Sequence, residues 1–260
     1  MINIPFLPER SCKPRTTGIT MMMDKGLSLK ETENFISSSS EYTDFVKFGF
    51  GTALITKNLE EKIKLYKEAN IKPYLGGTLF EIFIIRGLFD EYRSLIDKLK
   101  LEVAEVSDGA ITMNHDDKCK YIDVLSKQVT VLSEVGSKDA GVTIPPEEWN
   151  SMMKTELSAG AWKVIAEARE SGNLGIYNSD GKANKSLIDN ILCDIAPEKV
   201  LWEAPQKAQQ VWFIKLLGSN VNLGNISNQE VISLETLRLG LRGDTLMDFL
   251  PNNSYINENY

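Results

Sequence analysis

The stretch "VTVLSEVG" (residues 129–136) decides the fold and also raises the question of function. Apolar and β-branched residues dominate it, which predicts a buried β-strand. A fully buried carboxylate is rare, yet Glu134 interrupts the apolar run, and Lys138 follows shortly after Gly136. The stretch therefore predicts a strand that carries a charged group into the interior of the protein.

Runs of the same kind recur along the chain, at residues 18–24, 44–50, 71–77, 102–109, 173–179, 199–204 and 220–226. Segments with helical spacing separate them, and some open with a capping signal such as Ser28-x-x-Glu31. Strands that alternate with helices form parallel βαβ units. Eight strands in about 250 residues predict a closed (β/α)8 TIM barrel, with an open doubly wound sheet as the alternative.

The connection after residues 129–136 is the longest and predicts two helices. One opens at "PPEEW" (145–149), because proline is favoured in the first turn of a helix. The other passes through Ala161, Ile165 and Ala168, whose spacing puts them on one helical face.

Composition and charge restrict the function. Of the 260 residues 42% are hydrophobic, which is enough for one large core. With 29 Lys and Arg against 36 Asp and Glu the net charge is −7, which argues against nucleic acid or an anionic membrane as a partner. The three cysteines are widely spaced, and no apolar run could span a bilayer. We expect a cytoplasmic protein with one domain over residues 1–260, including polar tails at about 1–16 and 245–260.

Charged residues within the predicted strands indicate a site in the barrel interior. Side chains of a strand alternate between the interior and the helical layer, and the helix-facing set should be apolar. Val46, Phe48 and Phe50 then face the helices, so Lys47 points inward. By the same alternation the inward set also contains Glu105, Ser107, Glu134 and Glu203.

A buried cluster of these charges has two interpretations. It can be a structural ion cluster, because a charge buried alone costs several kcal/mol and needs a partner. It can also hold a cation: carboxylates without histidine or thiolate neighbours suit Mg²⁺, so Glu105, Glu134 and Glu203 are the predicted metal ligands. Their place near the carboxyl ends of the strands favours the metal site. Lys138 in the next loop would lie over the same ion.

Glycines and cations near the strand ends predict an anion site. "LGGT" (75–78) opens a helix, where Gly76, Gly77 and Thr78 offer backbone amides. "LGNIS" (223–227) is expected after strand eight, where barrels often bind phosphate, and contains Gly224 and Asn225. The cations that would join them are Lys25, Lys47, Arg169 and Arg242. Tight turns also need glycine, and the arginines also fit surface ion pairs. The pattern predicts a small anionic substrate.

The only histidine, His115, lies in "ITMNHDDKCKYI" (111–122). Asn114 is a favoured helix N-cap, so these residues predict the start of a helix and not a general base. We expect this segment to lie away from the site.

Ordered motifs along the chain resemble those of the phosphosulfolactate synthase family. They run from about Arg15 to about Thr245 in the order and spacing of that family. The motifs are "GITMMMDKGLS" (18–28), "DFVKFGFGT" (44–52), "PYLGGTLFE" (73–81), "EVSDG" (105–109), "SEVGSK" (133–138), "EARESGNLGIY" (167–177), "LWEAP" (201–205), "QQVWFIKLLGSNVNLGNI" (209–226) and "LETLRLGLRGDT" (234–245). The resemblance implies a (β/α)8 barrel, a homo-oligomer, Mg²⁺ dependence, and addition of sulfite to phosphoenolpyruvate to give (2R)-2-phospho-3-sulfolactate. In methanogens this reaction begins coenzyme M biosynthesis.

The chemistry of that reaction agrees with the predicted interior charges. Attack of sulfite on the methylene carbon leaves negative charge beside the substrate carboxylate, where it spreads into an enediolate. Mg²⁺ on the carboxylate would act as a Lewis acid, and a lysine would then protonate the carbon. Lys138 is the predicted acid and Lys25 the alternative, while Lys47, Ser107 and the anion site would bind the substrates.

Two other functions stay open. A different Mg²⁺-dependent barrel lyase or isomerase of enolase-like logic would use the same groups on another phosphorylated acid. The family also resembles a plant heat-stress-associated protein, so a non-catalytic homologue is the third possibility. The inward charges argue against it, because a barrel without catalysis should carry apolar residues there.

Overall fold

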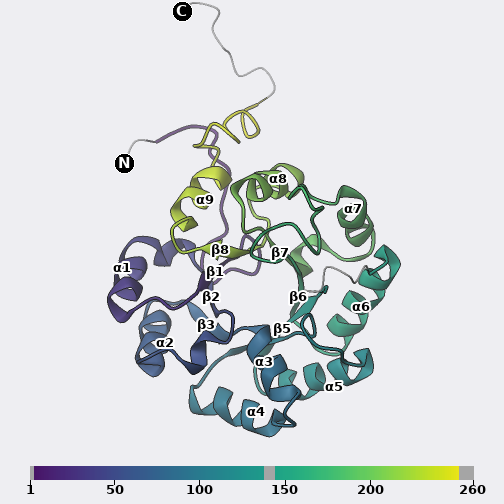
Figure 1. Ribbon diagram of the computed structural model, residues 1–260. Helices are drawn as coiled ribbons and strands as arrows, with labels where there is room; N and C mark the ends of the chain where they lie inside the picture. The colour runs from purple at the N-terminus through teal and green to yellow at the C-terminus, as the bar shows by residue number, and fades with distance from the viewer. Residues whose placement is uncertain (1–2, 138–143, 252–260) are drawn as a thin grey trace, which may run out of the picture.

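The computed structural model describes residues 3–137 and 144–251 and shows a ring of parallel strands surrounded by helices (Figure 1). The hydrogen-bonded order of the eight strands is β3-β2-β1-β8-β7-β6-β5-β4, and β3 contacts β4 to complete the ring. This confirms the predicted TIM barrel. The strands are β1 (Thr20–Asp24), β2 (Phe45–Phe48), β3 (Lys72–Leu75), β4 (Val103–Val106), β5 (Thr130–Val135), β6 (Lys163–Ala166), β7 (Val200–Glu203) and β8 (Leu223–Ser227).

Helices form the outer layer, and their starts follow from local capping. Ser28 and Glu31 form a capping box at α1, Asn114 caps α5 through the amide of Asp116, and Pro146 begins α6. Within the described part of the chain no helix is long and apolar enough to cross a membrane. The α-helices are α1 (Leu29–Ser39), α2 (Leu59–Glu68), α3 (Gly77–Ile84), α4 (Phe89–Lys98), α5 (His115–Ser126), α6 (Pro146–Ser158), α7 (Lys185–Asp194), α8 (Lys207–Leu217) and α9 (Val231–Arg238).

The sixth strand is not where the sequence pattern predicted it. The prediction of a strand at 173–179 is wrong, and so is the helix predicted through Ala161, Ile165 and Ala168, because β6 occupies Lys163–Ala166. Four buried residues are too few to separate a strand from a helix by periodicity. Small and apolar residues at 161, 165 and 168 imitate a helical face, although Ile165 packs in the barrel interior while Ala161 and Ala168 pack in the outer core.

Residues 173–179 instead belong to the connection between β6 and α7, which is held at several points. The amide of Ile176 donates to the carbonyl of Glu167 over 3.1 Å, and the Tyr177 hydroxyl donates to the carbonyl of Glu203 over 2.6 Å. Both side chains are buried, which explains the apolar character that suggested a strand.

The eighth strand also differs from its prediction, because "LGNIS" (223–227) is β8 itself and not the loop after it. A Cβ on Gly224 would lie 2.8 Å from Met21 Cε, so the glycine permits close packing between strands. Asn225 has a left-handed φ of 57°, and the pairing with β1 shifts register between Thr20 and Met22. The irregularity bends the end of β8 next to the mouth of the barrel.

The predicted alternation of side chains is confirmed in four strands. Val46, Ala104, Val131 and Trp202 pack in the outer core between sheet and helices. The apolar residues that fill the barrel interior are Ile19, Met21, Met23, Phe45, Tyr74, Val103, Leu132, Ile165 and Leu201. They close the amino-terminal part of the lumen, so the inward charges lie above them at the carboxyl ends of the strands.

Two arginines connect different segments of the chain at the amino-terminal end of the barrel. Arg238 is fully buried and donates to the carbonyls of Ser219, Val221 and Ile19 at 2.7, 2.6 and 3.1 Å. Arg10 pairs with Glu235 at 2.8 Å, which fixes the chain before β1 across this end.

Candidate active site

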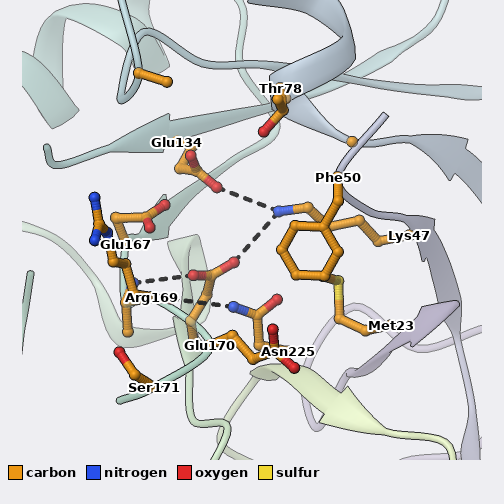
Figure 2. Close-up of a pocket in the computed structure, with 15 residues that line it drawn as sticks. Met23, Lys47, Phe50, Thr78, Glu134, Glu167, Arg169, Glu170, Ser171 and Asn225 are labelled. Atoms are coloured by element: carbon orange, nitrogen blue, oxygen red, sulfur yellow. Dashed lines mark hydrogen bonds and ion pairs between the residues drawn. The ribbon is translucent and has the colours of Figure 1, made fainter. Parts of the chain in front are cut away.

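The carboxyl ends of the strands surround a cavity of about 360 Å³. Figure 2 shows Lys47, Glu134 and Glu167 among the side chains that line it. The buried Glu203 also lines the cavity, and the exposed Phe50 and Arg169 lie nearer the solvent. Lys47 comes from β2, Glu134 from β5 and Glu203 from β7. The cavity therefore collects side chains from several strands, as active sites of TIM barrels do.

Lys47 lies among carboxylates. Its ammonium is 2.8 Å from Glu105, 3.2 Å from Glu134 and 3.3 Å from Glu203, and all four side chains are buried. Burial alone lowers the pKa of Lys47, but the three carboxylates together raise it well above its ordinary value. The ammonium therefore stays charged at neutral pH and acts as a fixed cation.

Glu167, which lies just after β6, joins two of these glutamates. One oxygen each from Glu134, Glu167 and Glu203 lies within 4.8 Å of the others, and the three residues are buried. Burial raises the pKa of Glu203 to about 7, which Lys47 opposes and Glu134 reinforces. Excess buried carboxylate at this point would be relieved by a proton or by a cation. Three carboxylates as donors fit a hard divalent cation such as Mg²⁺.

Glu105, the third predicted metal ligand, is directed elsewhere. Its Oε1 accepts a 2.5 Å hydrogen bond from the amide of Gly77, at the start of α3, in addition to the Lys47 ion pair. A Cβ on Gly77 would clash with Ser107, so only glycine permits this approach. Glu105 thus binds one amide that "LGGT" was expected to offer to a substrate. Gly76, Gly77 and Thr78 line the cavity, and their role in anion binding stays a prediction.

Ser107 connects the cavity wall with α3. Its hydroxyl oxygen is 2.9 Å from Glu134 Oε1 and 2.5 Å from Oε1 of the buried Glu81. Ser107 is fully buried. The geometry makes it a support for the Glu134 carboxylate, and its predicted contact with substrate is not tested.

Near the opening the predicted residues separate into two groups. Arg169 and Asn225 line the cavity, and Asn225 Nδ2 donates to the carbonyl of Ala168 over 3.1 Å. Arg242 lies outside this cavity and pairs with Asp244 at 3.4 Å. The prediction that Phe50 faces the helices is wrong: it follows β2 with a left-handed φ of 55°, is 53% exposed and lines the cavity.

The two lysines considered as the acid differ in what the structure describes. Lys25 follows β1 and pairs with Glu170 from the β6–α7 connection, beside a smaller cavity of about 120 Å³. Lys138 lies outside the described residues, so its predicted role is not tested. Gly136, two residues before it, has a φ of 136° that favours glycine.

Sequence reasoning missed Glu167 because it misplaced β6. The signal was available: Glu105, Glu134 and Glu203 each follow two non-charged strand residues and precede Val or Ala, and "IAEA" (165–168) repeats that pattern around Glu167. Four strands with one pattern would have placed four glutamates at one end of the barrel.

A second set of missed residues fixes the chain around Lys25. Asp24 at the end of β1 accepts from the amides of Gly26 and Leu27 at 2.9 Å. The buried Lys62 and Tyr66 of α2 lie 2.7 and 2.9 Å from its other oxygen. No short motif indicates this arrangement, since Asp24 and Tyr66 are 42 residues apart in the chain.

Sequence comparisons match most of the chain to known proteins. The pattern of the (2R)-phospho-3-sulfolactate synthase (ComA) family matches residues 8–244. The phosphosulfolactate synthase of Bacillus subtilis is 45% identical over 92% of this chain and 96% of its own length. Those of Methanothermobacter thermautotrophicus and Methanocaldococcus jannaschii are 41% and 42% identical, over 92% and 88% of this chain and 95% and 93% of their own lengths.

Solved structures with little sequence identity share the fold. A fungal endo-β-N-acetylglucosaminidase matches with a TM-score of 0.59 at 12% identity, over 85% of this chain and 98% of its own. The 3-hexulose-6-phosphate synthase of Salmonella typhimurium matches with a TM-score of 0.55 at 14% identity, over 86% and 100%. At such low identity these similarities support the barrel alone.

Proposed function

The chain belongs to the (2R)-phospho-3-sulfolactate synthase family, a family of enzymes, and from that membership we propose that it adds sulfite to phosphoenolpyruvate with the help of Mg²⁺. The proposed product is (2R)-2-phospho-3-sulfolactate. The single observation that carries the proposal is the buried group of Glu134, Glu167 and Glu203 beside the Lys47 ammonium, inside the cavity.

The reaction needs one new bond and one proton. The sulfur lone pair of sulfite attacks the methylene carbon of phosphoenolpyruvate, and the electrons of the double bond move toward the carboxylated carbon as an enediolate. A proton then reaches that carbon, so no bond to phosphate breaks. The barrier lies in bringing two anions together and in stabilising the charge that develops on the carboxylate.

The described residues answer both requirements. Glu134, Glu167 and Glu203 would hold Mg²⁺, which supplies Lewis acidity toward the substrate carboxylate when bound. Lys47 stays cationic because of its carboxylate neighbours, so it contributes a fixed positive charge at the inner end of the cavity. Arg169 at the opening supports the proposal as a cation for a substrate anion.

Delivery of the proton is the least constrained step. Lys47 is a poor acid, because its carboxylate neighbours raise its pKa. On sequence grounds Lys138 stays the proposed acid. Lys25 is the alternative, and its partner Glu170 would have to release it first.

Product analysis tests the proposal. The purified protein should convert phosphoenolpyruvate and sulfite to phosphosulfolactate in Mg²⁺, as detected by mass spectrometry, and should stop in excess EDTA. Glu203→Gln should abolish most of the activity, whereas Glu33→Gln on the exposed face of α1 should not. A wild-type protein that makes no phosphosulfolactate under these conditions would exclude the synthase and favour another anionic substrate.

A further inference from the structure

The segment "ITMNHDDKCKYI" (111–122) carries a buried lysine that reaches the candidate site. Lys118 on α5 is fully buried, and its ammonium has three acceptors. They are Asp108 Oδ1 at 2.8 Å, Glu156 Oε1 at 2.8 Å and the carbonyl oxygen of Glu134 at 2.6 Å. The expectation that this segment lies away from the site is therefore wrong.

The contact with Glu134 occurs where the strand ladder ends. The pairing of β4 with β5 stops at Val106 opposite Ser133, one residue before Glu134. The carbonyl of Glu134 lies beyond that last pair, and Lys118 supplies a donor to it from the helical layer. The backbone of Glu134 is thus held on one side while its carboxylate points into the cavity on the other.

The contact with Asp108 supports the same carboxylate by a second route. Asp108 follows Ser107 directly, and the Ser107 hydroxyl is 2.9 Å from Glu134 Oε1. By binding Asp108, Lys118 fixes the start of the β4–α5 connection and with it the position of Ser107. One ammonium therefore binds the backbone of Glu134 and also the residue next to the serine that contacts its carboxylate.

Stability alone does not account for this arrangement. The buried Glu156, the partly buried Asp108 and the buried Lys118 ammonium lose hydration on folding, and well-packed apolar residues often serve a fold equally well. The third hydrogen bond of the Lys118 ammonium goes to the backbone carbonyl of Glu134, a contact that an ion pair alone would not require.

We propose that Lys118 is a positioning residue that holds Glu134 in the geometry needed to bind a divalent cation. The inference rests on the proposed function, because it takes Glu134 as a cation ligand. Lys118 lies in the helical layer and acts through Glu134, without touching the substrates itself.

The test compares two buried lysines. Lys62 on α2 is equally buried and binds one carboxylate, fewer than Lys118, and one carbonyl, those of Asp24 and Leu27, at 2.7 and 2.6 Å. Lys118→Met and Lys62→Met should both lower the melting temperature. Only Lys118→Met should weaken Mn²⁺ binding, by about 10- to 100-fold, the usual effect of losing a group that orients a metal ligand. Mn²⁺ binding is measured directly by electron paramagnetic resonance, without turnover.

Each outcome decides the question. Equal Mn²⁺ affinity in Lys118→Met and the wild type, or equal losses in both variants, would overturn the positioning role. If Lys118→Met does not fold, Asp108→Asn keeps the side-chain shape and should show a smaller loss of Mn²⁺ affinity; no loss would count against the proposal.

A wild type that binds Mn²⁺ but makes no phosphosulfolactate removes the synthase proposal and leaves this one standing. A wild type that binds no divalent cation overturns the inference.

Discussion

The two ends of the barrel bury cations in different ways. At the amino-terminal end, Arg238 donates to three backbone carbonyls, and Arg10 faces one carboxylate, Glu235. At the carboxyl end, the Lys47 ammonium faces three carboxylates, and Glu167 lies beside two of them. Two arginines therefore accompany one carboxylate at the first end, whereas four carboxylates gather around one ammonium at the second.

This difference separates structural charges from functional ones. Carbonyls satisfy a buried guanidinium without introducing an opposite charge, so Arg238 can join the residues before β1 to those before β8 without a carboxylate partner. Burial lowers the pKa of Arg238 to about 9, the cost of such a site. The excess of carboxylates at the mouth has no structural benefit of that kind, because buried negative charges that lie close together repel one another. We propose that a bound cation offsets this repulsion.

The largest expected effect comes from removing the central cation of the mouth. Lys47→Met leaves three buried carboxylates facing one another, so stability should fall by about 3–5 kcal/mol, the cost of breaking a buried pair. Mg²⁺ should recover part of the loss, because it restores positive charge. Chemical denaturation with and without Mg²⁺ measures both effects.

Arg238→Met is the control at the other end. It should also destabilise, since it leaves buried carbonyls without a donor, but Mg²⁺ should not restore its stability. A Lys47→Met protein that is as stable as the wild type in EDTA would mean that the carboxylates at the mouth are largely protonated, and the comparison would fail.

The next effect compares carboxylates at the two ends. Glu203→Gln keeps the shape of the side chain and removes a proposed cation ligand, so kcat/KM should fall by at least about 100-fold. Glu235→Gln removes the partner of Arg10 and should cost stability with little change in kcat/KM. Steady-state kinetics at saturating Mg²⁺ distinguishes them, and equal losses in kcat/KM would contradict the division of roles.

The smallest effect concerns Lys163, the first residue of β6, at the amino-terminal end. Burial lowers its pKa to about 8, and Lys199 adds to this shift. In the unfolded chain Lys163 keeps its proton up to about pH 10.5. Between about pH 8 and pH 10.5 the unfolded state therefore binds more protons than the folded state, and the contribution of Lys163 to the free energy of unfolding rises with pH. The cost of burying the charge is therefore fully present below pH 8.

Lys163→Met should remove that cost. The variant should be more stable than the wild type by about 2 kcal/mol at pH 7, with a difference that shrinks toward pH 10. Urea denaturation of both proteins at pH 7 and pH 10 measures it. A constant difference across this range would mean that Lys163 contributes through packing on Trp162 and not through its charge.

The sequence predicted the barrel and the inward glutamates for a physical reason. Alternation along a strand is local, so Glu105, Glu134 and Glu203 could be assigned to the interior without knowledge of the neighbours. The same logic failed at β6, because four residues between two helices carry too weak a periodicity. Glu167 was lost with that strand.

Partners within the site were beyond sequence reasoning because they depend on tertiary contacts. Nothing local shows that Glu105 turns to the amide of Gly77, 28 residues away, while Glu134 stays with Glu167. Lys118 likewise looks like an ordinary residue in the first turn of a helix, and only the packing of α5 against β5 brings it to Glu134.

A crystal structure of the wild-type protein with Mn²⁺ tests whether the charge imbalance at the mouth is the proposed cation site. We expect one anomalous scattering peak bounded by oxygens of Glu134, Glu167 and Glu203, within about 2.0–2.4 Å of each ligand oxygen. A protein that makes phosphosulfolactate but shows no peak at these carboxylates, or shows the metal elsewhere, would contradict it.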